Sequence, residues 1–372
     1  MNILFFFTYG TSLKDWNDSG YLSRELKFFK KMNELYDTKY ILITFGDESD
    51  FDLKVDKSYL RVVPIYKHLK KSSNKVIDIL NLLFGVKNLI KELNLDYDLI
   101  RTNQLYGAWL AIFQKFISRK PLIIRTGYDL FVFSVKDKKN ILKIILYYIL
   151  TFVALNCCNL YTVTSNTDYK FLKNYFLFKK SKLKIRSNWV EVPRQQISDG
   201  FSSDSVLAVG RLETQKDYKY LINIFNKSNF ELHIVGSGML EDNLKSISEK
   251  NIKFFGNVEF EKLNKMYHQY KFYVTSTNYE GNPKALLEAM ANGCIVIAPQ
   301  LSNIMEIITN NKNGITYDKK RDDILQIINE INKKPEVFKF LSENAQKHVQ
   351  DHNSLDLFAG NESKDYELLI DI

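Results

Sequence analysis

The sequence predicts an α/β protein in which two parallel β-sheets are each covered by helices. Short apolar runs rich in β-branched and aromatic residues alternate with longer segments of helical periodicity, and this alternation occurs in two separate series. Between the series, residues 187–205 hold Pro193, Gly200 and several serines, which is typical of a linker. A length of 372 residues allows two cores of ordinary size, and 45% hydrophobic with 26% charged residues is the composition of a globular protein.

The first series of elements fills the N-terminal half. Its strand segments are rich in Ile, Val, Leu and Phe, whereas its helical segments repeat apolar residues at every third or fourth position. Strands are expected at Ile3–Phe7, Tyr40–Thr44, Val62–Pro64, Leu99–Arg101, Leu122–Arg125 and Tyr161–Thr164. Helices are expected near Ser19–Leu35, Val76–Leu93, Gly107–Ile117 and 141–155.

The second series has the same character. Strands are expected at Val206–Val209, Glu231–Val235, Ile252–Phe255, Phe272–Val274 and Ile295–Ala298, with helices between them. Parallel strands need such crossover helices, so each half is expected to form a sheet with helices on both faces.

The segment 141–155 is dominated by Ile, Leu, Tyr, Phe and Val. It is shorter than the roughly 20 residues that a membrane-spanning helix needs, and Lys143 interrupts it, so no span is predicted. We expect a buried helix that leads into the strand at Tyr161–Thr164. The alternative is a helix laid partly into a membrane surface.

The formal net charge is +9, and its excess gathers in the first half, in lysine-rich clusters at residues 67–75, 136–139 and 179–186. Such clusters usually form solvated faces, and they also suit anionic lipid headgroups, which makes an anionic membrane surface a candidate partner. No recognised nucleic-acid-binding motif accompanies the charge, so nucleic acid is not an expected partner.

The cysteines and histidines indicate neither a disulfide framework nor a metal centre. Cys157 and Cys158 are adjacent, and the third cysteine forms no Cys-x2-Cys pair, which favours a reducing compartment. His348 and His352 lie four apart, but without an HExxH pattern. The first residues lack the basic region and the apolar stretch of a signal peptide. We therefore expect a cytoplasmic protein, placed at the inner face of the cell membrane if the lysine clusters bind lipid.

Two carboxylates eight positions apart mark the strongest candidate site. Glu280 precedes the turn at residues 281–283, and Glu288 lies just over one turn inside the helix that residues 284–290 predict. Pro283 suits the first turn of that helix, because its missing N–H costs nothing there. The free N–H groups of a helix start bind anions, so the segment from Asn282 to Lys284 is expected to hold one.

A second motif, at residues 206–217, places cations directly after a strand. The apolar run ends at Gly210, Arg211 follows at once, and Lys216 comes five residues later. Arg offers a planar fork for phosphate oxygens and Lys a point charge, so the pair suits a diphosphate. Asp217 is expected to cap the next helix. Gly236, in a Gly-x-Gly that lacks the rest of a dinucleotide fingerprint, belongs either to a plain tight turn or to a secondary ligand contact.

Both motifs resemble those of retaining GT-B glycosyltransferases of family 4 (group 1). The resemblance is carried by the Gly-Arg-Leu…Lys element and by the Glu-x7-Glu element, whose acids are flanked by Glu-Gly-Asn-Pro and Leu-Glu-Ala-Met-Ala. The resemblance is strong over roughly residues 187–350 and looser before them. It implies the GT-B fold, with two Rossmann-like domains facing across a cleft. The acceptor-side domain would be 1–186, the nucleotide-sugar-binding domain 187–354, and a C-terminal segment, 355–372, would return to the first domain.

The resemblance also implies a role for each site residue. Arg211 and Lys216 would bind the pyrophosphate of the donor, Glu288 would hold the ribose hydroxyls, and Glu280 would contact the donor sugar. No metal and no cofactor is expected, because cations take the place of the metal. The implied catalytic residues are Glu280 and Asp129, and the implied donor-binding residues are Arg211, Lys216, Asn282, Pro283, Lys284, Glu288 and Gly20.

The N-terminal half carries three further places of interest. Gly20, in the polar stretch after the first strand, is the best match to a Gly-rich loop that approaches the donor phosphate and the acceptor in this family. Tyr128 stands where many family members have a histidine near the transferred sugar, and Asp129 follows it, with a structural turn as its alternative role. Arg101 and the three residues after it end another strand and are expected to line the acceptor side.

The resemblance implies a retaining hexosyltransferase that uses a UDP- or GDP-sugar and a glycan or lipid-linked acceptor, in bacterial surface polysaccharide synthesis. The leaving diphosphate would accept the proton of the acceptor on the same face, which retains the anomeric configuration. The sequence leaves other functions open: a silent GT-B paralogue that binds sugar nucleotides, a nucleotide-sugar epimerase or phosphorylase, and a basic nucleic-acid-binding protein.

Overall fold

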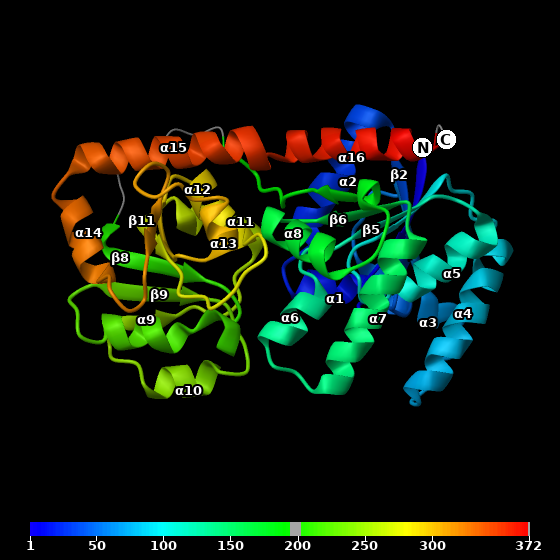
Figure 1. Ribbon diagram of the computed structural model, residues 1–372, viewed down its shortest axis with the longest axis horizontal. Helices are drawn as coiled ribbons and strands as arrows, with labels where there is room; N and C mark the ends of the chain where they lie inside the picture. The colour runs from blue at the N-terminus through cyan, green and yellow to red at the C-terminus, as the bar shows by residue number, and fades with distance from the viewer. Residues whose placement is uncertain (194–201, 371–372) are drawn as a thin grey trace. The chain divides into compact units, whose positions relative to one another are not determined.

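The structure of the chain is a computed structural model, and it describes residues 1–193 and 202–370. Its contacts divide it into two compact units, which Figure 1 shows with their labelled elements. Unit 1 consists of Met1–Arg186 and Ala359–Ile372, and unit 2 is Ser187–Phe358. Part of the predicted linker, residues 194–201, and the last two residues of the predicted C-terminal segment lie outside the described residues.

Unit 1 is built on a parallel sheet in which seven described strands follow the order β3-β2-β1-β4-β5-β6-β7. The strand order reverses between β1 and β4, as in dinucleotide-binding folds. The strands are β1 (Asn2–Phe6), β2 (Lys39–Thr44), β3 (Leu60–Pro64), β4 (Leu99–Thr102), β5 (Leu122–Arg125), β6 (Leu160–Val163) and β7 (Leu183–Ile185).

Helices cover both faces of this sheet. The α-helices of the first unit are α1 (Leu13–Asp18), α2 (Leu22–Tyr36), α3 (Ile65–His68), α4 (Lys75–Glu92), α5 (Ala108–Ser118), α6 (Leu130–Lys136), α7 (Ile141–Cys157) and α8 (Asn166–Tyr175). The aromatic core centres on Phe5, whose ring makes edge contacts with Phe29 at 5.5 Å, Phe7 at 5.8 Å and Tyr40 at 6.2 Å between centroids. Such edge-to-face pairs stabilise a core beyond their buried area.

The strand β7 and the helices α1, α3, α6 and α8 of unit 1 were not expected from the sequence. Strand β7 is a three-residue edge strand, too short to show a periodic pattern. Helix α1 lies in the stretch expected to be a polar loop. Its cap explains it: the Ser12 side chain accepts from the Asp15 N–H, and the Asp15 carboxylate accepts from the Ser12 N–H at 2.7 Å, while Trp16 is buried. This is a capping box with Asp in place of Glu.

The prediction that helix α7 is buried is wrong for most of its apolar side chains. Only Thr151, Ala154 and Leu155 are buried, whereas Leu142 is 72% exposed and Leu146 is 59% exposed. The apolar content of the segment predicts a core helix, but only one narrow face of α7 is buried against the rest of unit 1. Within the described residues, no helix is both long and apolar enough to cross a membrane.

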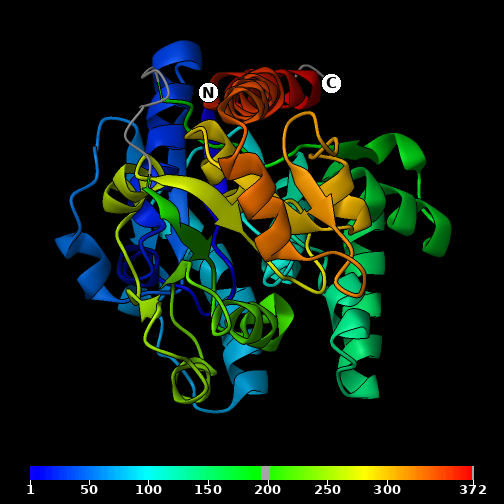
Figure 2. The same cartoon turned by 90° about the vertical axis from the view of Figure 1, so that its left-hand side faces the viewer.

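Unit 2 is built on a second parallel sheet, in which six described strands follow the order β10-β9-β8-β11-β12-β13. These strands come to the front in Figure 2. The order again reverses once, between β8 and β11, where Val206 is paired with Phe272. The strands are β8 (Ser202–Val209), β9 (Glu231–Val235), β10 (Ile252–Phe254), β11 (Tyr270–Val274), β12 (Ile295–Pro299) and β13 (Ile315–Tyr317), of which β13 was not expected.

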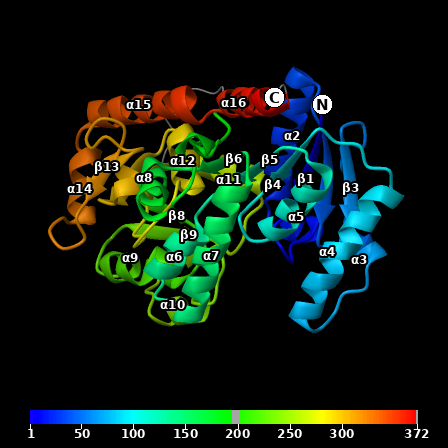
Figure 3. The same ribbon diagram turned by 45° about the vertical axis from the view of Figure 1, so that its right-hand side comes forward.

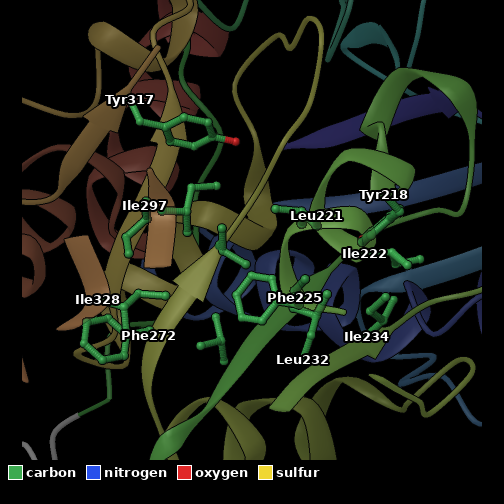
Figure 4. Packing of buried hydrophobic residues seen from close by; sticks show 14 of the residues in the cluster. Tyr218, Leu221, Ile222, Phe225, Leu232, Ile234, Phe272, Ile297, Tyr317 and Ile328 are labelled. Atoms are coloured by element: carbon green, nitrogen blue, oxygen red, sulfur yellow. The ribbon is translucent and has the colours of Figure 1, made fainter. Parts of the chain in front are cut away.

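Two apolar clusters lie on opposite faces of this sheet. One gathers side chains from α9, α10 and α14, such as Phe225 and Ile328, around Phe272 of the sheet (Figure 4). The other gathers α11, α12, α13 and α15, with Leu286 and Met290 fully buried. The helices of unit 2 are α9 (Tyr218–Phe225), α10 (Glu241–Ser246), α11 (Phe260–Tyr267), α12 (Lys284–Ala291), α13 (Ser302–Met305), α14 (Ile324–Asn332) and α15 (Pro335–Asn353).

The last helix, α16 (Leu355–Ile370), is fixed to unit 1 by buried ion pairs from Ala359 onward. Nε of Arg101 donates to the Glu362 carboxylate at 2.9 Å, and both side chains are almost completely buried. Asp365 accepts from Lys184 at 2.8 Å and from Arg186 at 2.7 Å. The side chain of Arg101 therefore lies in the interior of unit 1. The prediction that it lines the acceptor side is wrong for this residue.

Candidate functional site

The two motifs of the second half follow the two strands at which the strand order of unit 2 reverses. Gly210 and Arg211 come directly after β8, and the segment 275–283 comes directly after β11. In open α/β sheets, ligands bind outside the carboxyl ends of the strands at this reversal, because the loops diverge there and leave backbone groups accessible. The fold thus explains why segments far apart in the sequence lie together.

Hydrogen bonds join these two loops along their length. The Ser276 hydroxyl contacts the carbonyl oxygens of Lys216 at 2.9 Å and Asp217 at 2.8 Å. The side-chain amide of Gln215 donates to the Tyr279 carbonyl at 2.8 Å. Because each bond is between a polar side chain and a backbone carbonyl, the loops hold each other in a fixed register.

Lys216 and Glu280 form the central contact of the site. The Lys216 ammonium donates to the Glu280 carboxylate, and only 17% and 9% of the two side chains are exposed. Arg211, the other predicted phosphate ligand, is different: its side chain is 60% exposed and pairs with Glu213 at 3.0 Å. The structure therefore brings Lys216 and Glu280 together and leaves the Arg211 guanidinium at the surface of unit 2.

Glu288 lies on α12 and is 5% exposed. The Tyr267 hydroxyl donates to its carboxylate at 3.4 Å. Tyr273, on β11, lies near both acids: burial raises the pKa of its hydroxyl well above the ordinary value, and the charges of Glu280 and Glu288 raise it further. Both predicted carboxylates are thus in one electrostatic environment, beside phenols that stay protonated and can donate hydrogen bonds.

The start of α12 is held by unit 2 itself. The Asn282 side-chain oxygen accepts from the Asn188 N–H at 2.9 Å, and its carbonyl accepts from the Asn188 amide at 2.6 Å. Pro283 occupies the N-cap position, one residue before the predicted first turn, and Lys284 begins the helix with its ammonium 5.3 Å from the Trp189 ring centroid. The Asn282 side chain therefore positions the helix start, and the backbone of the first turn remains the predicted anion contact.

Gly236 has a structural explanation. A Cβ atom at this residue would lie 2.1 Å from the carbonyl oxygen of Gly210, and its φ of +134° disfavours any other residue. The loop after β9 therefore packs directly on the loop after β8. Asp217 also differs from expectation: its φ is +50° and its carboxylate does not cap α9, but pairs with Lys319 at 2.7 Å.

The predicted site residues of unit 1 lie in two separate loops. Gly20 has a φ of +72°, lies between α1 and α2, and donates its N–H to the Asn17 carbonyl at 2.9 Å. Tyr128 is 43% exposed, with its ring 5.0 Å from that of Phe133.

Asp129 is 1% exposed and is held on both sides of its carboxylate. One oxygen caps α6 by accepting from the N–H groups of Phe131 at 3.0 Å and Val132 at 3.1 Å, and the other accepts from the Tyr161 hydroxyl at 3.0 Å. Burial raises the pKa of Asp129 to about 6, and these hydrogen bonds oppose the shift. This geometry favours the structural alternative for the side chain.

Sequence reasoning missed the residues that surround the two acids. Tyr218, Tyr267 and Tyr273 look like core residues, because each is an apolar-period position of a helix or strand. Asn188 fell in the predicted linker. At the reversal point of unit 1, Tyr9 lies 5.7 Å from the ring of Tyr106, and the Tyr9 N–H donates to the Tyr106 carbonyl at 2.9 Å. Only its position after the first strand marks this pair in the sequence.

Within residues 1–193 and 202–370, no three side chains of His, Cys, Asp or Glu are placed together so as to hold a metal ion. The charges of the candidate site are those of Lys216, Glu280 and Glu288, with Arg211 at its edge. This set can hold an anion and hydroxyl groups at the same time.

Sequence comparison agrees with this geometry. Residues 198–348 match the family described as glycosyl transferases group 1. An uncharacterized glycosyltransferase of Methanocaldococcus jannaschii is 30% identical over 200 residues, which span 50% of this chain and 51% of that protein. The chain thus matches about half the length of that relative. The O-antigen biosynthesis glycosyltransferase WbnH of Escherichia coli is 26% identical over 246 residues, or 65% of this chain and 69% of that protein.

Solved structures agree on the fold. The sucrose-phosphate synthase of Thermosynechococcus elongatus superposes with a TM-score of 0.80 at 15% identity and covers 99% of both chains. Anabaena HepE in complex with UDP-glucose superposes with a TM-score of 0.73 at 18% identity, over 99% of this chain and 100% of that chain. Residues 198–348, which make up most of the second unit, thus match the glycosyl transferases group 1, and the two units of the chain have the GT-B fold.

Proposed function

We propose that the protein is a retaining glycosyltransferase that moves a hexose-type sugar from a UDP- or GDP-sugar to a glycan or lipid-linked acceptor. The observation that carries the proposal is the contact between Lys216 and Glu280, which brings the cationic and the acidic motif to one point of unit 2. The family match supports the reaction class, and the O-antigen relative supports a role in surface polysaccharide synthesis.

In this proposal the diphosphate of the donor lies between Lys216 and the first turn of α12. Departure of the nucleoside diphosphate builds negative charge on its oxygens, and a preorganised ammonium with helix N–H groups stabilises that charge. Arg211 is the more exposed of the two predicted phosphate ligands, so it would have to leave Glu213 to reach the donor. No metal ion is required by this arrangement.

The two acids are assigned different partners. Glu288 would accept hydrogen bonds from the ribose hydroxyls, with Tyr267 holding its carboxylate in place. Glu280 would position the hydroxyls of the transferred sugar while its carboxylate accepts a hydrogen bond from the Lys216 ammonium. The leaving diphosphate itself would accept the proton of the attacking acceptor hydroxyl, and attack on the same face retains the anomeric configuration.

The test is thermal unfolding of the full chain with UDP, GDP, ADP and their common sugar conjugates. A ligand that binds only the folded state raises the unfolding temperature in proportion to the logarithm of its concentration above its dissociation constant. We expect one nucleotide family to stabilise the chain, and Glu288→Gln to lose most of that stabilisation. Glu330→Gln, an exposed position on α14, is the matched control and should behave as the native chain.

A donor that binds must then be turned over. Incubation with the stabilising nucleotide-sugar and a cell-envelope glycan fraction should release free nucleoside diphosphate and retain the anomeric configuration in the product. Binding without any release of diphosphate, with or without acceptor, would favour the silent-paralogue function. An absence of stabilisation by every nucleotide would contradict the donor site itself.

A further inference from the structure

One edge of unit 1 carries an unusual concentration of exposed apolar side chains. Helix α4 leads into β4, and helix α7 leads into β6, so both helices begin at the edge where the parallel strands have their carboxyl ends. The N-terminal ends of α4 and α7 both project from this edge, apart from one another, and α5 packs against both helices (Figures 1 and 3). We call the first halves of α4 and α7, with the turn between α6 and α7, the helix tip.

Along α7 the exposed apolar side chains form a continuous stripe. Leu142 is 72% exposed, Leu146 is 59% exposed and Ile149 is 52% exposed, and these residues recur at helical spacing on one face. Lys143 is the only charged residue between Ile141 and Cys157. The other exposed apolar residues of this helix are Ile141, Ile145, Tyr148, Phe152 and Val153.

Helix α4 contributes a second stripe. Val76 is 67% exposed, Leu80 is 50% exposed and Phe84 is 64% exposed, again at four-residue spacing. The Phe84 ring makes an edge contact with Phe113 of α5, at 6.4 Å between centroids, so the faces of α4 and α5 adjoin. Two exposed apolar stripes on neighbouring helices at one edge are uncommon on the surface of a globular protein and mark an interaction site.

Lysines surround the apolar side chains of the tip. The segment from Lys67 to Val76 contains four lysines and no acid, and Lys70, Lys71 and Lys75 are exposed. The turn between α6 and α7 adds a second group: Lys136, Lys138, Lys139 and Lys143. The acids are few: Asp137 pairs with Lys139 at 3.4 Å, and Asp78 is buried and accepts from the hydroxyls of Tyr9 and Tyr66. The tip is therefore apolar in its centre and cationic at its rim.

The lysines around the helix tip favour some partners of its apolar surface over others. A second copy of this chain would bring the same lysines against one another, which opposes association. An anionic lipid surface complements them, since apolar side chains enter the headgroup boundary while lysines contact lipid phosphates. We propose that the helix tip docks the protein onto an anionic bilayer, with the apolar stripes of α4 and α7 lying in the interface. This proposal does not depend on the proposed enzymatic function.

The experiment is sedimentation of the full chain with vesicles of phosphatidylcholine, with and without phosphatidylglycerol, at low and high salt. We expect binding to the anionic vesicles, weakened by salt. Leu142→Ser with Leu146→Ser should reduce the affinity at least about tenfold, because two anchoring side chains are lost. Lys138→Gln with Lys139→Gln should reduce it roughly five-fold for each charge and flatten the salt dependence.

Leu35→Ser, an exposed position on α2, and Lys364→Gln, an exposed position on α16, are the matched controls and should bind as the native chain. An absence of binding to anionic vesicles, or equal loss in controls and tip variants, would overturn the proposal. So would a concentration-dependent dimer that Leu142→Ser with Leu146→Ser dissolves without any change in vesicle binding. Nucleotide stabilisation in the absence of vesicles should be the same in every variant, which separates a failure here from a failure of the donor site.

Discussion

The ammonium of Lys216 contacts the carboxylate of Glu280 across 64 residues of sequence. Each side chain follows one of the two strands at which the order of the second sheet reverses. Because both are almost enclosed, neither charge is well solvated, and each depends on the other for compensation. If the proposed donor binds here, its phosphate would share this compensation, and the pair would couple the stability of the loops to donor binding.

This coupling leads to the first prediction. Lys216→Met leaves the Glu280 carboxylate partly buried without its cation, and we expect a loss of stability of about 3 kcal/mol together with loss of nucleotide binding. Glu280→Gln removes the acid but keeps a hydrogen-bond acceptor, so the loss of stability should be smaller. The double variant should be less destabilised than the sum of the two. Urea unfolding of all four proteins measures this interaction energy.

Lys262→Met, on α11 with its side chain 73% exposed, is the control for loss of a lysine and should change stability by less than about 0.5 kcal/mol. Strictly additive effects of the two site substitutions would show that the contact contributes nothing.

Much of the fold follows from local patterns, and the exceptions have physical causes. The strands Leu122–Arg125 and Glu231–Val235 were predicted at their observed bounds, since buried parallel strands are short apolar runs between turns. The strands β7 and β13 have three residues each, and their pairing comes from a neighbouring strand rather than from their own pattern. The prediction that helix α7 is buried was wrong for a different reason. Hydropathy alone cannot distinguish a side chain that faces the core from one that faces the surface.

The candidate site also has some features that were predicted from the sequence and others that were not. The family resemblance implied that Lys216 and Glu280 bind the same donor, and the structure places them together because parallel strands present their following loops at one edge. The sequence could not predict that Arg211 pairs with Glu213, or that the Asn282 side-chain oxygen accepts from the Asn188 N–H. These contacts depend on the detailed path of each loop. The assignment of individual residues to donor and sugar stays a prediction.

Asp129 gives the second prediction, through its pKa. Burial raises this pKa from 3.8 to about 6, so the folded chain binds more protons than the unfolded chain between these two values. The contribution of Asp129 to stability is therefore fully present below about pH 4, is lost as the pH rises through 6, and is constant above it. The difference in unfolding free energy between the native chain and Asp129→Asn should fall over this window by up to roughly 3 kcal/mol.

The comparison of the native chain with Asp129→Asn at each pH cancels the titration of all other groups. A flat difference for Asp129→Asn would mean that the carboxylate titrates normally. If Asp129→Asn abolishes transfer while its stability at pH 7 is unchanged, the catalytic assignment of Asp129 would be favoured over the structural one.

The buried pair of Arg101 and Glu362 supports a third prediction. Glu362→Ala leaves the guanidinium of Arg101 buried without its main counter-charge, and removes the acceptor of the Tyr366 hydroxyl at 2.9 Å. We expect a loss of about 3–5 kcal/mol, because an uncompensated buried charge is costly. Denaturant unfolding, followed by tryptophan fluorescence, measures it. Lys364→Ala is exposed on the same helix and should cost less than about 0.5 kcal/mol; an equal cost for both variants would show that α16 is held by helix packing alone.

The close approach of the loops after β8 and β9 supports the fourth prediction. In Gly236→Ala, the new Cβ atom would lie 2.1 Å from the Gly210 carbonyl oxygen, so one loop must move. Since Gly210 directly precedes Arg211 and the Lys216 loop, we expect loss of nucleotide stabilisation in addition to a loss of more than about 2 kcal/mol in stability. Gly256→Ala is the control for a positive φ alone, because its φ of +64° also disfavours Ala, although less than +134° does, and no atom lies within 4 Å of the added carbon. The control should cost about 1 kcal/mol and keep nucleotide stabilisation. Equal effects of the two alanines would mean that backbone strain, and not the contact between the loops, sets the requirement for glycine.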